Sequence, residues 1–128
     1  MRPGRPYTVV LVDDSTPYRR GIARAIDAHD ELVLVGECDG GEAGLAAIEA
    51  LRPDVVVLDV RMPDVDGLTI CRRLRDEPGT RTRAVVISAG MDDVVRGLAL
   101  AAGAAATLSK TATRREICSA AVRVARAG

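Results

Sequence analysis

The sequence has very few aromatic side chains. Of its 128 residues none is Phe or Trp, and Tyr7 and Tyr18 are the only tyrosines. Proteins that bind single-stranded nucleic acid use aromatic rings as platforms on which bases stack. The near absence of such rings argues against this class of protein, and any hydrophobic core must be built from Val, Leu, Ile and Ala.

An excess of charge of either sign is also missing. Lys plus Arg and Asp plus Glu each count 18, so the formal net charge is zero, which gives no electrostatic case for nucleic acid or an anionic membrane as the direct partner. No apolar run approaches the ~20 residues of a membrane span, and the first six residues lack the apolar segment of a secretory signal. We therefore expect a cytoplasmic protein with a disordered tail at residues 1–6.

Cysteine and histidine are too sparse for several kinds of site. Cys38, Cys71 and Cys118 are odd in number and far apart, which fits neither a disulfide framework nor a metal site. We interpret them as small buried hydrophobic residues in a reducing cytoplasm. His29 is the only histidine, and we expect it to be solvated at the end of a helix.

Short apolar runs alternate with helical patterns along the chain, which is long enough for one domain, expected at residues 7–128. The runs at 8–12, 32–35, 55–58, 84–87 and 105–108 are typical of buried strands. Thr16 suits a helix N-cap with Pro17 in the first turn, a second helix is expected at 43–51, and Thr113 with Glu116 forms a capping box. This α/β alternation predicts right-handed βαβ units and a doubly wound parallel sheet.

Polar side chains follow four of the five predicted strands. Asp13 and Asp14 follow the first, Asp59 the third, Ser88 the fourth and Lys110 the fifth. In a sheet of order 2-1-3-4-5 all of them lie at one edge, and strands 1 and 3 are neighbours at the switch point. Three crowded carboxylates need compensating cations. Lys110 supplies one positive charge, and a hard divalent cation such as Mg²⁺ would supply the rest.

Phosphoryl transfer is the chemistry that suits this set, because it needs positioning and positive charge more than covalent help. Asp59 would be the nucleophile that forms an aspartyl phosphate, with Lys110 and the Ser88 hydroxyl on the incoming oxygens. Each signal is weak alone: Asp59 could simply end a strand, and a lone lysine is usually solvated. Their common position at strand ends favours a shared site.

With these motifs the chain resembles the receiver domain of two-component response regulators. The resemblance covers roughly residues 7–125, and the motifs that carry it are Asp13-Asp14, the run Leu58-Asp59-Val60-Arg61-Met62-Pro63-Asp64-Val65-Asp66-Gly67, Ser88-Ala89 and Lys110. It implies a flavodoxin-like fold with five parallel strands and five helices. It also implies phosphorylation of Asp59 by a partner histidine kinase.

The resemblance further implies how Mg²⁺ is held. Asp14 and Asp59 would be ligands together with the backbone carbonyl of Arg61, and Asp13 would act mainly through water. Ser88 and Lys110 would bind the phosphoryl group and trigger a rearrangement of the surface formed by the fourth helix, the fifth strand and the fifth helix. Family members often use that surface for dimerisation, so a homodimer is one expected form.

Two positions depart from the family pattern. Thr107 stands where the family usually has a Tyr or Phe that rotates as a switch, and Thr111 follows the lysine where many members have Pro. The C-terminal part resembles receivers that precede a helix-turn-helix DNA-binding domain. The 128 residues hold no such domain, so we expect either a stand-alone receiver or a fragment of a longer regulator, and no direct contact of this chain with nucleic acid.

Three alternatives remain open. The same fold can serve as an interaction module that does not depend on phosphorylation, which Thr107 favours and the complete set of site residues disfavours. A phosphatase of the haloacid-dehalogenase type needs a second acid two residues after the nucleophile, where Arg61 stands. A flavin-binding module needs a phosphate-binding loop after the first strand, where Asp13 and Asp14 would repel a phosphate.

Overall fold

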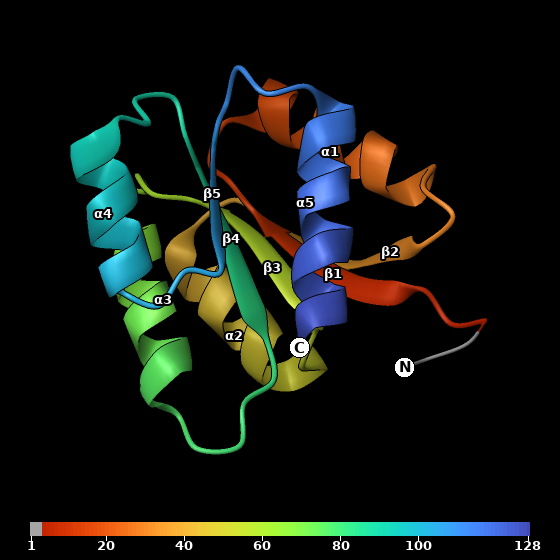
Figure 1. Ribbon diagram of the computed structural model, residues 1–128, viewed down its shortest axis with the longest axis horizontal. Coiled ribbons are helices and arrows are strands. Elements are labelled where there is room, and N and C mark those ends of the chain that lie inside the picture. The colour runs from red at the N-terminus through yellow and green to blue at the C-terminus, as the bar shows by residue number, and fades with distance from the viewer. Residues whose placement is uncertain (1–3) are drawn as a thin grey trace.

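The computed structural model describes residues 4–128, in which five strands and five helices alternate (Figure 1). The predicted alternation is thereby confirmed. In chain order the elements are β1 (Tyr7–Val12), α1 (Thr16–Asp27), β2 (Leu32–Cys38), α2 (Gly41–Leu51), β3 (Val55–Asp59), α3 (Gly67–Asp76), β4 (Arg83–Ser88), α4 (Asp93–Ala101), β5 (Ala106–Ser109) and α5 (Arg114–Ala127).

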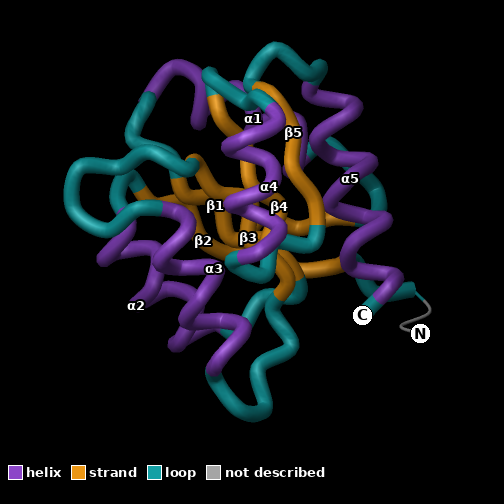
Figure 2. Tube along the Cα trace, turned by 60° about the vertical axis from the view of Figure 1, so that its left-hand side comes forward, coloured by secondary structure: helices purple, strands orange, loops and turns teal. Residues whose placement is uncertain are grey.

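All five strands are parallel and form one sheet of order β2-β1-β3-β4-β5. This is the predicted doubly wound, flavodoxin-like order, and it makes β1 and β3 neighbours at the switch point. Helices cover both faces (Figure 2). α1 and α5 pack on one face, and α2, α3 and α4 pack on the other.

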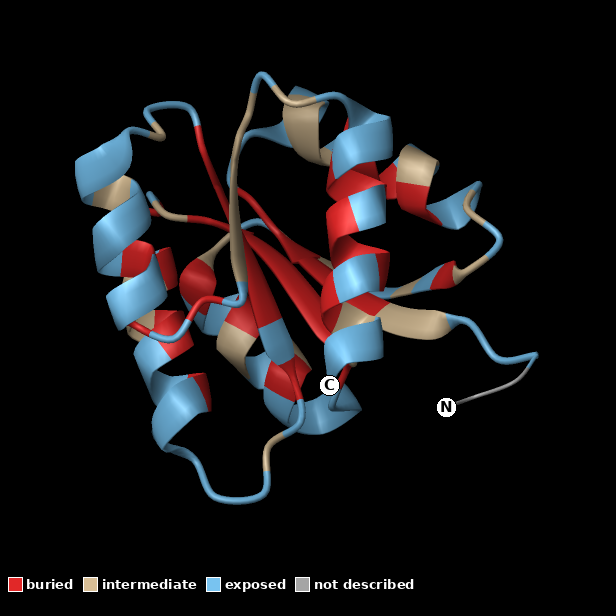
Figure 3. Cartoon of the chain, viewed as in Figure 1, coloured by how far each residue is buried: buried red, intermediate tan, exposed pale blue. Residues whose placement is uncertain are grey.

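The central strands are buried on both faces, which explains why their sequences are unbroken apolar runs. Every residue of β3 is buried, and Figure 3 shows the burial concentrated in the inner strands. Val55 and Val57 belong to the core under α1 and α5, whereas Val56 and Leu58 belong to the core under α2, α3 and α4. The absence of Phe and Trp is thus met by two layers of aliphatic side chains.

The prediction that the cysteines are buried is confirmed for two of the three. Cys71 and Cys118 are buried, Cys38 is half-buried, and all three are free thiols. Burial raises the pKa of Cys71 to about 11, so this thiol stays protonated. His29 is less solvated than expected: it is half-buried, and its Nδ1 accepts a hydrogen bond from the Glu31 amide at 3.1 Å. None of the helices in residues 4–128 is long and apolar enough to cross a membrane.

The prediction that Thr16 is the N-cap of the first helix was wrong by one residue. Ser15 occupies the N-cap, Thr16 is the first helical residue, and Pro17 lies in the first turn as expected. The Asp13 carboxylate accepts a hydrogen bond from the Ser15 amide at 2.7 Å. This short-range turn brings the chain into the helix one residue earlier than the sequence pattern suggested.

β2 is longer than predicted, because it continues past Val35 to Cys38. The pairing with β1 is irregular at that point: Val9 pairs with Leu34, and Val10 pairs with Gly36. Val35 is therefore left without a partner residue, as in a β-bulge. The bulge shifts the later residues by one position and breaks the alternation from which the strand end was predicted.

The second helix begins at Gly41 rather than at Ala43, because a distant side chain caps it. Asp64, in the loop between β3 and α3, accepts hydrogen bonds from the amides of Gly41 and Glu42, both at 2.9 Å. The N-cap position itself is Gly40, which has no side chain to offer. The hydrogen bonds that these two backbone amides donate lower the pKa of Asp64 to about 2.

We expect Asp64→Asn to lower the melting temperature at neutral pH by a few degrees, because each carboxylate oxygen accepts from a different backbone amide, whereas Asn replaces one of these oxygens with an NH₂ group and loses the attraction to the helix N-terminus. Since the folded-state pKa is depressed, the carboxylate stabilises the fold above its ordinary pKa, and this contribution disappears as the pH falls toward about 2. Thermal melts of both proteins should therefore converge on acidification. Asp93→Asn, an exposed carboxylate in the first turn of α4, is the control. A difference that persists at low pH would contradict the assignment.

The structure describes only residues 4–6 of the tail that was predicted at residues 1–6. Residues 1–3 lie outside the described residues, so nothing tests that part of the prediction. Gly4, Arg5 and Pro6 are exposed and belong to no helix or strand.

Candidate functional site

The sequence-predicted site residues meet at the carboxyl edge of the sheet. Asp13 follows β1 directly, Asp59 ends β3, Ser88 ends β4 and Lys110 follows β5. The parallel register accounts for the convergence, since Ile87 pairs with Asp59 and Ser109 with Ser88. Each strand therefore delivers its last side chain to the same edge.

Three carboxylates form the acidic part of the site. Asp13, Asp14 and Asp59 each offer an oxygen, and these oxygens all lie within 4.8 Å of one another. Asp13 is fully buried and Asp59 is 6% exposed, whereas Asp14 lies open to solvent. The cluster is thus closed from below by the sheet and accessible on the side of Asp14.

Lys110 joins two of these carboxylates. Its Nζ lies 2.8 Å from Asp13 Oδ2 and 3.0 Å from Asp59 Oδ2. Burial disfavours the charged ammonium, but the attraction of the Asp13 and Asp59 carboxylates outweighs it and raises the pKa of Lys110. The Lys110 amide also donates to the Ser88 carbonyl at 3.0 Å, which fixes the start of the lysine side chain beside β4.

The carboxylate of Asp59 is buried, and its surroundings shift its pKa in opposite directions. Burial raises its pKa, while the bond from Lys110 and the bond from the Arg61 amide act in the other direction. The Arg61 amide lies 3.2 Å from Asp59 Oδ1, which places the Arg61 backbone directly beside the carboxylate. A carboxylate that burial leaves poorly solvated and that Lys110 holds by its charge is suited to act as a nucleophile.

The loop after β3 is fastened against the site by backbone bonds. The Val60 amide donates to the Ile87 carbonyl at 3.1 Å, and the Gly67 amide donates to the Val60 carbonyl at 2.8 Å. Gly67 lies so close to the Asp59 carbonyl oxygen that a methyl group there would overlap it, and the same group would lie 2.8 Å from Leu58 Cδ1. The glycine is thus required by close packing against the backbone of Asp59.

The donor set fits a hard divalent cation. Asp13 Oδ2 is buried, and its contact with Lys110 is an ion pair without a well-aligned hydrogen bond. Three carboxylates against a single ammonium leave negative charge that one lysine does not neutralise. Oxygen ligands with room for water on the open side are what Mg²⁺ prefers.

Two other predicted positions lie near the site without joining it. Ser88 is buried, and its hydroxyl accepts from the Gly90 amide at 3.2 Å. Thr107 lies on β5, half-buried, and its hydroxyl accepts from Arg96 Nε of α4 at 3.2 Å. The position at which the family usually has an aromatic switch is therefore occupied by a polar link between β5 and α4.

Sequence reasoning missed one residue of this site, Tyr18. It lies in the first turns of α1, and Lys110 Nζ is 4.6 Å from the centre of its ring. A scarce aromatic residue one helical turn after the acidic pair is the signal that was available. That spacing indicates proximity to the acidic pair but gives no indication of the lysine.

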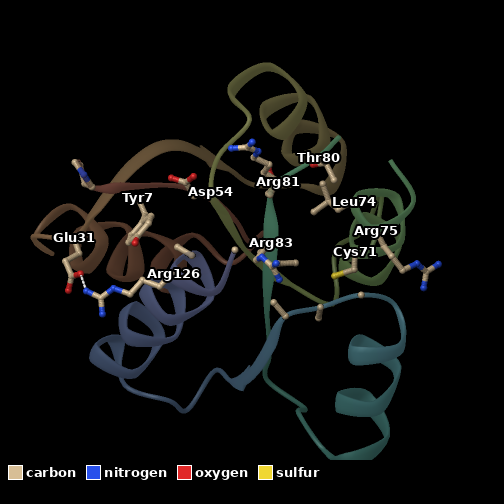
Figure 4. Close-up of a pocket in the computed structure, with 18 of the residues that line it drawn as sticks. Tyr7, Glu31, Asp54, Cys71, Leu74, Arg75, Thr80, Arg81, Arg83 and Arg126 are labelled. Atoms are coloured by element: carbon tan, nitrogen blue, oxygen red, sulfur yellow. Dashed lines mark hydrogen bonds and ion pairs between the residues drawn. The ribbon is translucent and has the colours of Figure 1, made fainter. Parts of the chain in front are cut away.

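A broad groove lies at the opposite, amino-terminal edge of the sheet (Figure 4). Tyr7, Asp54 and Arg83 line it at the beginnings of strands, and Arg126 forms an ion pair with Glu31 at its rim. None of the sequence-predicted site residues contributes to it. The groove is therefore separate from the acidic cluster.

Comparisons with known proteins agree on one family. The model described as "Response regulator receiver domain" matches residues 9–122. The probable transcriptional regulatory protein NarL of Mycobacterium tuberculosis is 40% identical over 109 residues, which cover 85% of this chain and 50% of that protein. The nitrate/nitrite response regulator protein NarL of Escherichia coli K12 is 37% identical over 95 residues, covering 73% and 44%. The chain spans about half the length of these curated relatives.

A solved structure extends the agreement to the backbone. The signal receiver domain of the M. tuberculosis response regulator NarL superposes with a TM-score of 0.92 at 37% identity, covering 97% of this chain and 99% of that one. A LuxR-family DNA-binding response regulator from Staphylococcus aureus shares the fold at 19% identity, with a TM-score of 0.87 and coverage of 93% and 98%. The chain therefore belongs to the response regulator receiver domains.

Proposed function

We propose that this receiver domain accepts a phosphoryl group on Asp59 from a histidine kinase and thereby switches a signalling output. The observation that carries the proposal is the pair of contacts that Lys110 makes with the buried carboxylates of Asp13 and Asp59. An ammonium already beside the acceptor lies where negative phosphoryl oxygens would arrive. Positive charge placed in advance is the main requirement of phosphoryl transfer.

In the proposed step an oxygen of the Asp59 carboxylate attacks the phosphorus of the phosphorylated donor. The new bond joins that oxygen to phosphorus, and the bond from phosphorus to the donor breaks, with its electron pair leaving on the donor. Lys110 shifts its ion pair from the carboxylate to the transferred phosphoryl oxygens. The Ser88 hydroxyl, which is buried at the end of the next strand, is the proposed hydrogen-bond donor to one of these oxygens.

We propose Mg²⁺ as the cofactor, held by Asp13, Asp14, Asp59 and the backbone carbonyl of Arg61. When bound, the ion supplies positive charge to the transferred oxygens. Asp13 would take part mainly through water, because one of its oxygens already accepts from the Ser15 amide and the other faces Lys110. Asp14 supplies the solvent-exposed side of the site.

The proposed output surface comprises α4, β5 and α5. Three large apolar side chains of α4 are open to solvent: Val94 is 70% exposed, Leu98 54% and Leu100 50%. Ala99 and Ala102 are buried in the core instead. Val94 and Leu98 lie one helical turn apart and form an exposed apolar pair on one side of α4, which suits contact with a second copy of the chain or with a further domain. We place the protein in the cytoplasm as a signalling module, with a C-terminal DNA-binding domain as a candidate for the remainder of a longer regulator.

A second candidate function is an interaction module that does not need phosphorylation. The observation that favours it is the hydrogen bond between Arg96 and Thr107, which joins α4 to β5 without a rotating aromatic ring. This module would keep the same fold and surface but would not respond to a phosphoryl donor.

Incubation of the protein with Mg²⁺ and acetyl phosphate distinguishes the two candidates. The intact mass should rise by one phosphoryl group, and the gain should disappear when the metal is removed with a chelator, because the carboxylates would then be left with Lys110 as the nearest compensating charge. Mass spectrometry of the intact protein gives the result directly. An unchanged mass in the presence of Mg²⁺, on a folded sample, would favour the interaction module.

A further inference from the structure

The ring of Tyr18 forms one wall of the lysine site. Lys110 Nζ lies 4.6 Å from the ring centre, within the range of a cation–π contact. The two residues come from opposite ends of the chain, α1 and the segment after β5, and Tyr18 packs on the core shared by α1 and α5. The ring is therefore anchored by packing and does not depend on the lysine for its position.

The tyrosine hydroxyl has no structural task of its own. Within residues 4–128 its oxygen is buried and has no hydrogen-bond partner. Burial is the main cause that raises the pKa of Tyr18, so the phenol remains neutral and the ring keeps its negative face. What the residue offers the site is the face of the ring.

The ammonium is thus contacted from three directions. Asp13 and Asp59 bind it by charge, and the ring of Tyr18 covers another side. Only 16% of the lysine side chain is exposed. Two carboxylates alone leave a flexible four-carbon side chain several ways to place its charge, whereas a fixed ring removes some of these positions and keeps water away.

We propose that Tyr18 is a positioning residue for phosphoryl transfer, which holds Lys110 between Asp13 and Asp59 through the face of its ring. The inference rests on the proposed function of Asp59. Loss of the ring should leave the carboxylates of Asp13 and Asp59 in place but allow the Lys110 ammonium to occupy several positions. Phosphoryl acceptance should then slow by about threefold to tenfold, as expected for a partly buried cation–π contact.

The contact can be tested without any phosphoryl donor, because Lys110 is the only lysine in the sequence. Lysine labelled with carbon-13 at Cε gives one NMR signal from the chain. Ring currents should move its attached protons upfield in the wild type. Tyr18→Phe, which keeps the ring, should retain this shift, and Tyr18→Leu should lose it. The control is Tyr7→Phe, at the far end of β1, which should leave the signal in place.

The rate is then measured with acetyl phosphate and Mg²⁺ by intact mass. We expect Tyr18→Phe to keep most of the wild-type rate. Tyr18→Leu should react about threefold to tenfold more slowly than the wild type. If Tyr18→Leu fails to fold, as judged by circular dichroism, Tyr18→Met provides a flexible side chain of similar reach without a ring. Wild type that accepts no phosphoryl group contradicts the proposed function, and the NMR result still decides the contact. An unshifted lysine signal in the wild type, or a ringless variant as fast as the wild type, overturns the inference.

Discussion

Asp59→Asn should abolish the Mg²⁺-dependent gain of one phosphoryl group while leaving the protein folded. An amide of nearly the same shape fills the same space, but its oxygen is a much weaker nucleophile than a carboxylate oxygen. The change also removes one of the negative charges around Lys110, but the ammonium keeps its ion pair with Asp13 and is not left buried without a counter-charge. Intact mass after incubation with acetyl phosphate measures the loss, and circular dichroism checks the fold.

Asp92→Asn is the matched control for this experiment. Asp92 is an exposed N-cap whose side chain accepts from the Val95 amide at 2.9 Å, and it does not belong to the acidic cluster. Asn is as good an N-cap as Asp, so this variant should gain mass like the wild type. If the Asp59→Asn protein still gained a phosphoryl group, another residue would have to be the acceptor.

Gly67→Ala should destabilise the protein severely, by about 3 kcal/mol or more, since the added methyl group has nowhere to go. It would overlap the Asp59 carbonyl oxygen and lie 2.8 Å from Leu58 Cδ1 and 3.0 Å from Val60 Cα. Backbone atoms make up much of this wall and cannot rotate away as a flexible side chain can. Relief of the overlap requires movement of β3 or α3, which also displaces the carboxylate of Asp59.

The matching substitution is Gly97→Ala, at another helical glycine. Gly97 lies inside α4, and an added methyl group would meet no atom within 4 Å. Ala is the better helix former by about 1 kcal/mol, so this variant should unfold at a higher denaturant concentration than the wild type. Urea unfolding of both variants gives the two free energies. A mild effect of Gly67→Ala would show that the loop after β3 can move more freely than its hydrogen bonds suggest.

The fold and most of the candidate site could be predicted because they depend on local patterns. A buried parallel strand has to be apolar throughout, so each run and the carboxylate at its end stand out, as Asp59 does after Leu58. Once five such runs alternate with helices, topology alone brings Asp13, Asp59 and Lys110 to one edge. The structure shows that these residues meet, as predicted, and the roles assigned to them await the experiments above.

What could not be predicted depends on contacts between distant segments. Asp64 decides where α2 begins, yet nothing near Gly41 in the sequence points to it. The bulge at Val35 follows from pairing with β1 and leaves no mark in the composition of the strand. Tyr18 lies against Lys110 only because α1 and the end of β5 meet in space. Helix starts, strand ends and the walls of the site were therefore less predictable than its carboxylates.

The hydrogen bonds of the loop after β3 restrain the surroundings of Asp59 more on one side than on the other. On one flank Asp64 ties the loop to α2, and the Gly67 amide closes it onto Val60. On the other flank β5 is a strand of four half-buried residues that pairs along one side with β4. If Asp59 accepts a phosphoryl group as proposed, we expect a displacement that starts there to meet more resistance toward α2 than toward β5, and the change of shape to occur at the β5 edge of the sheet.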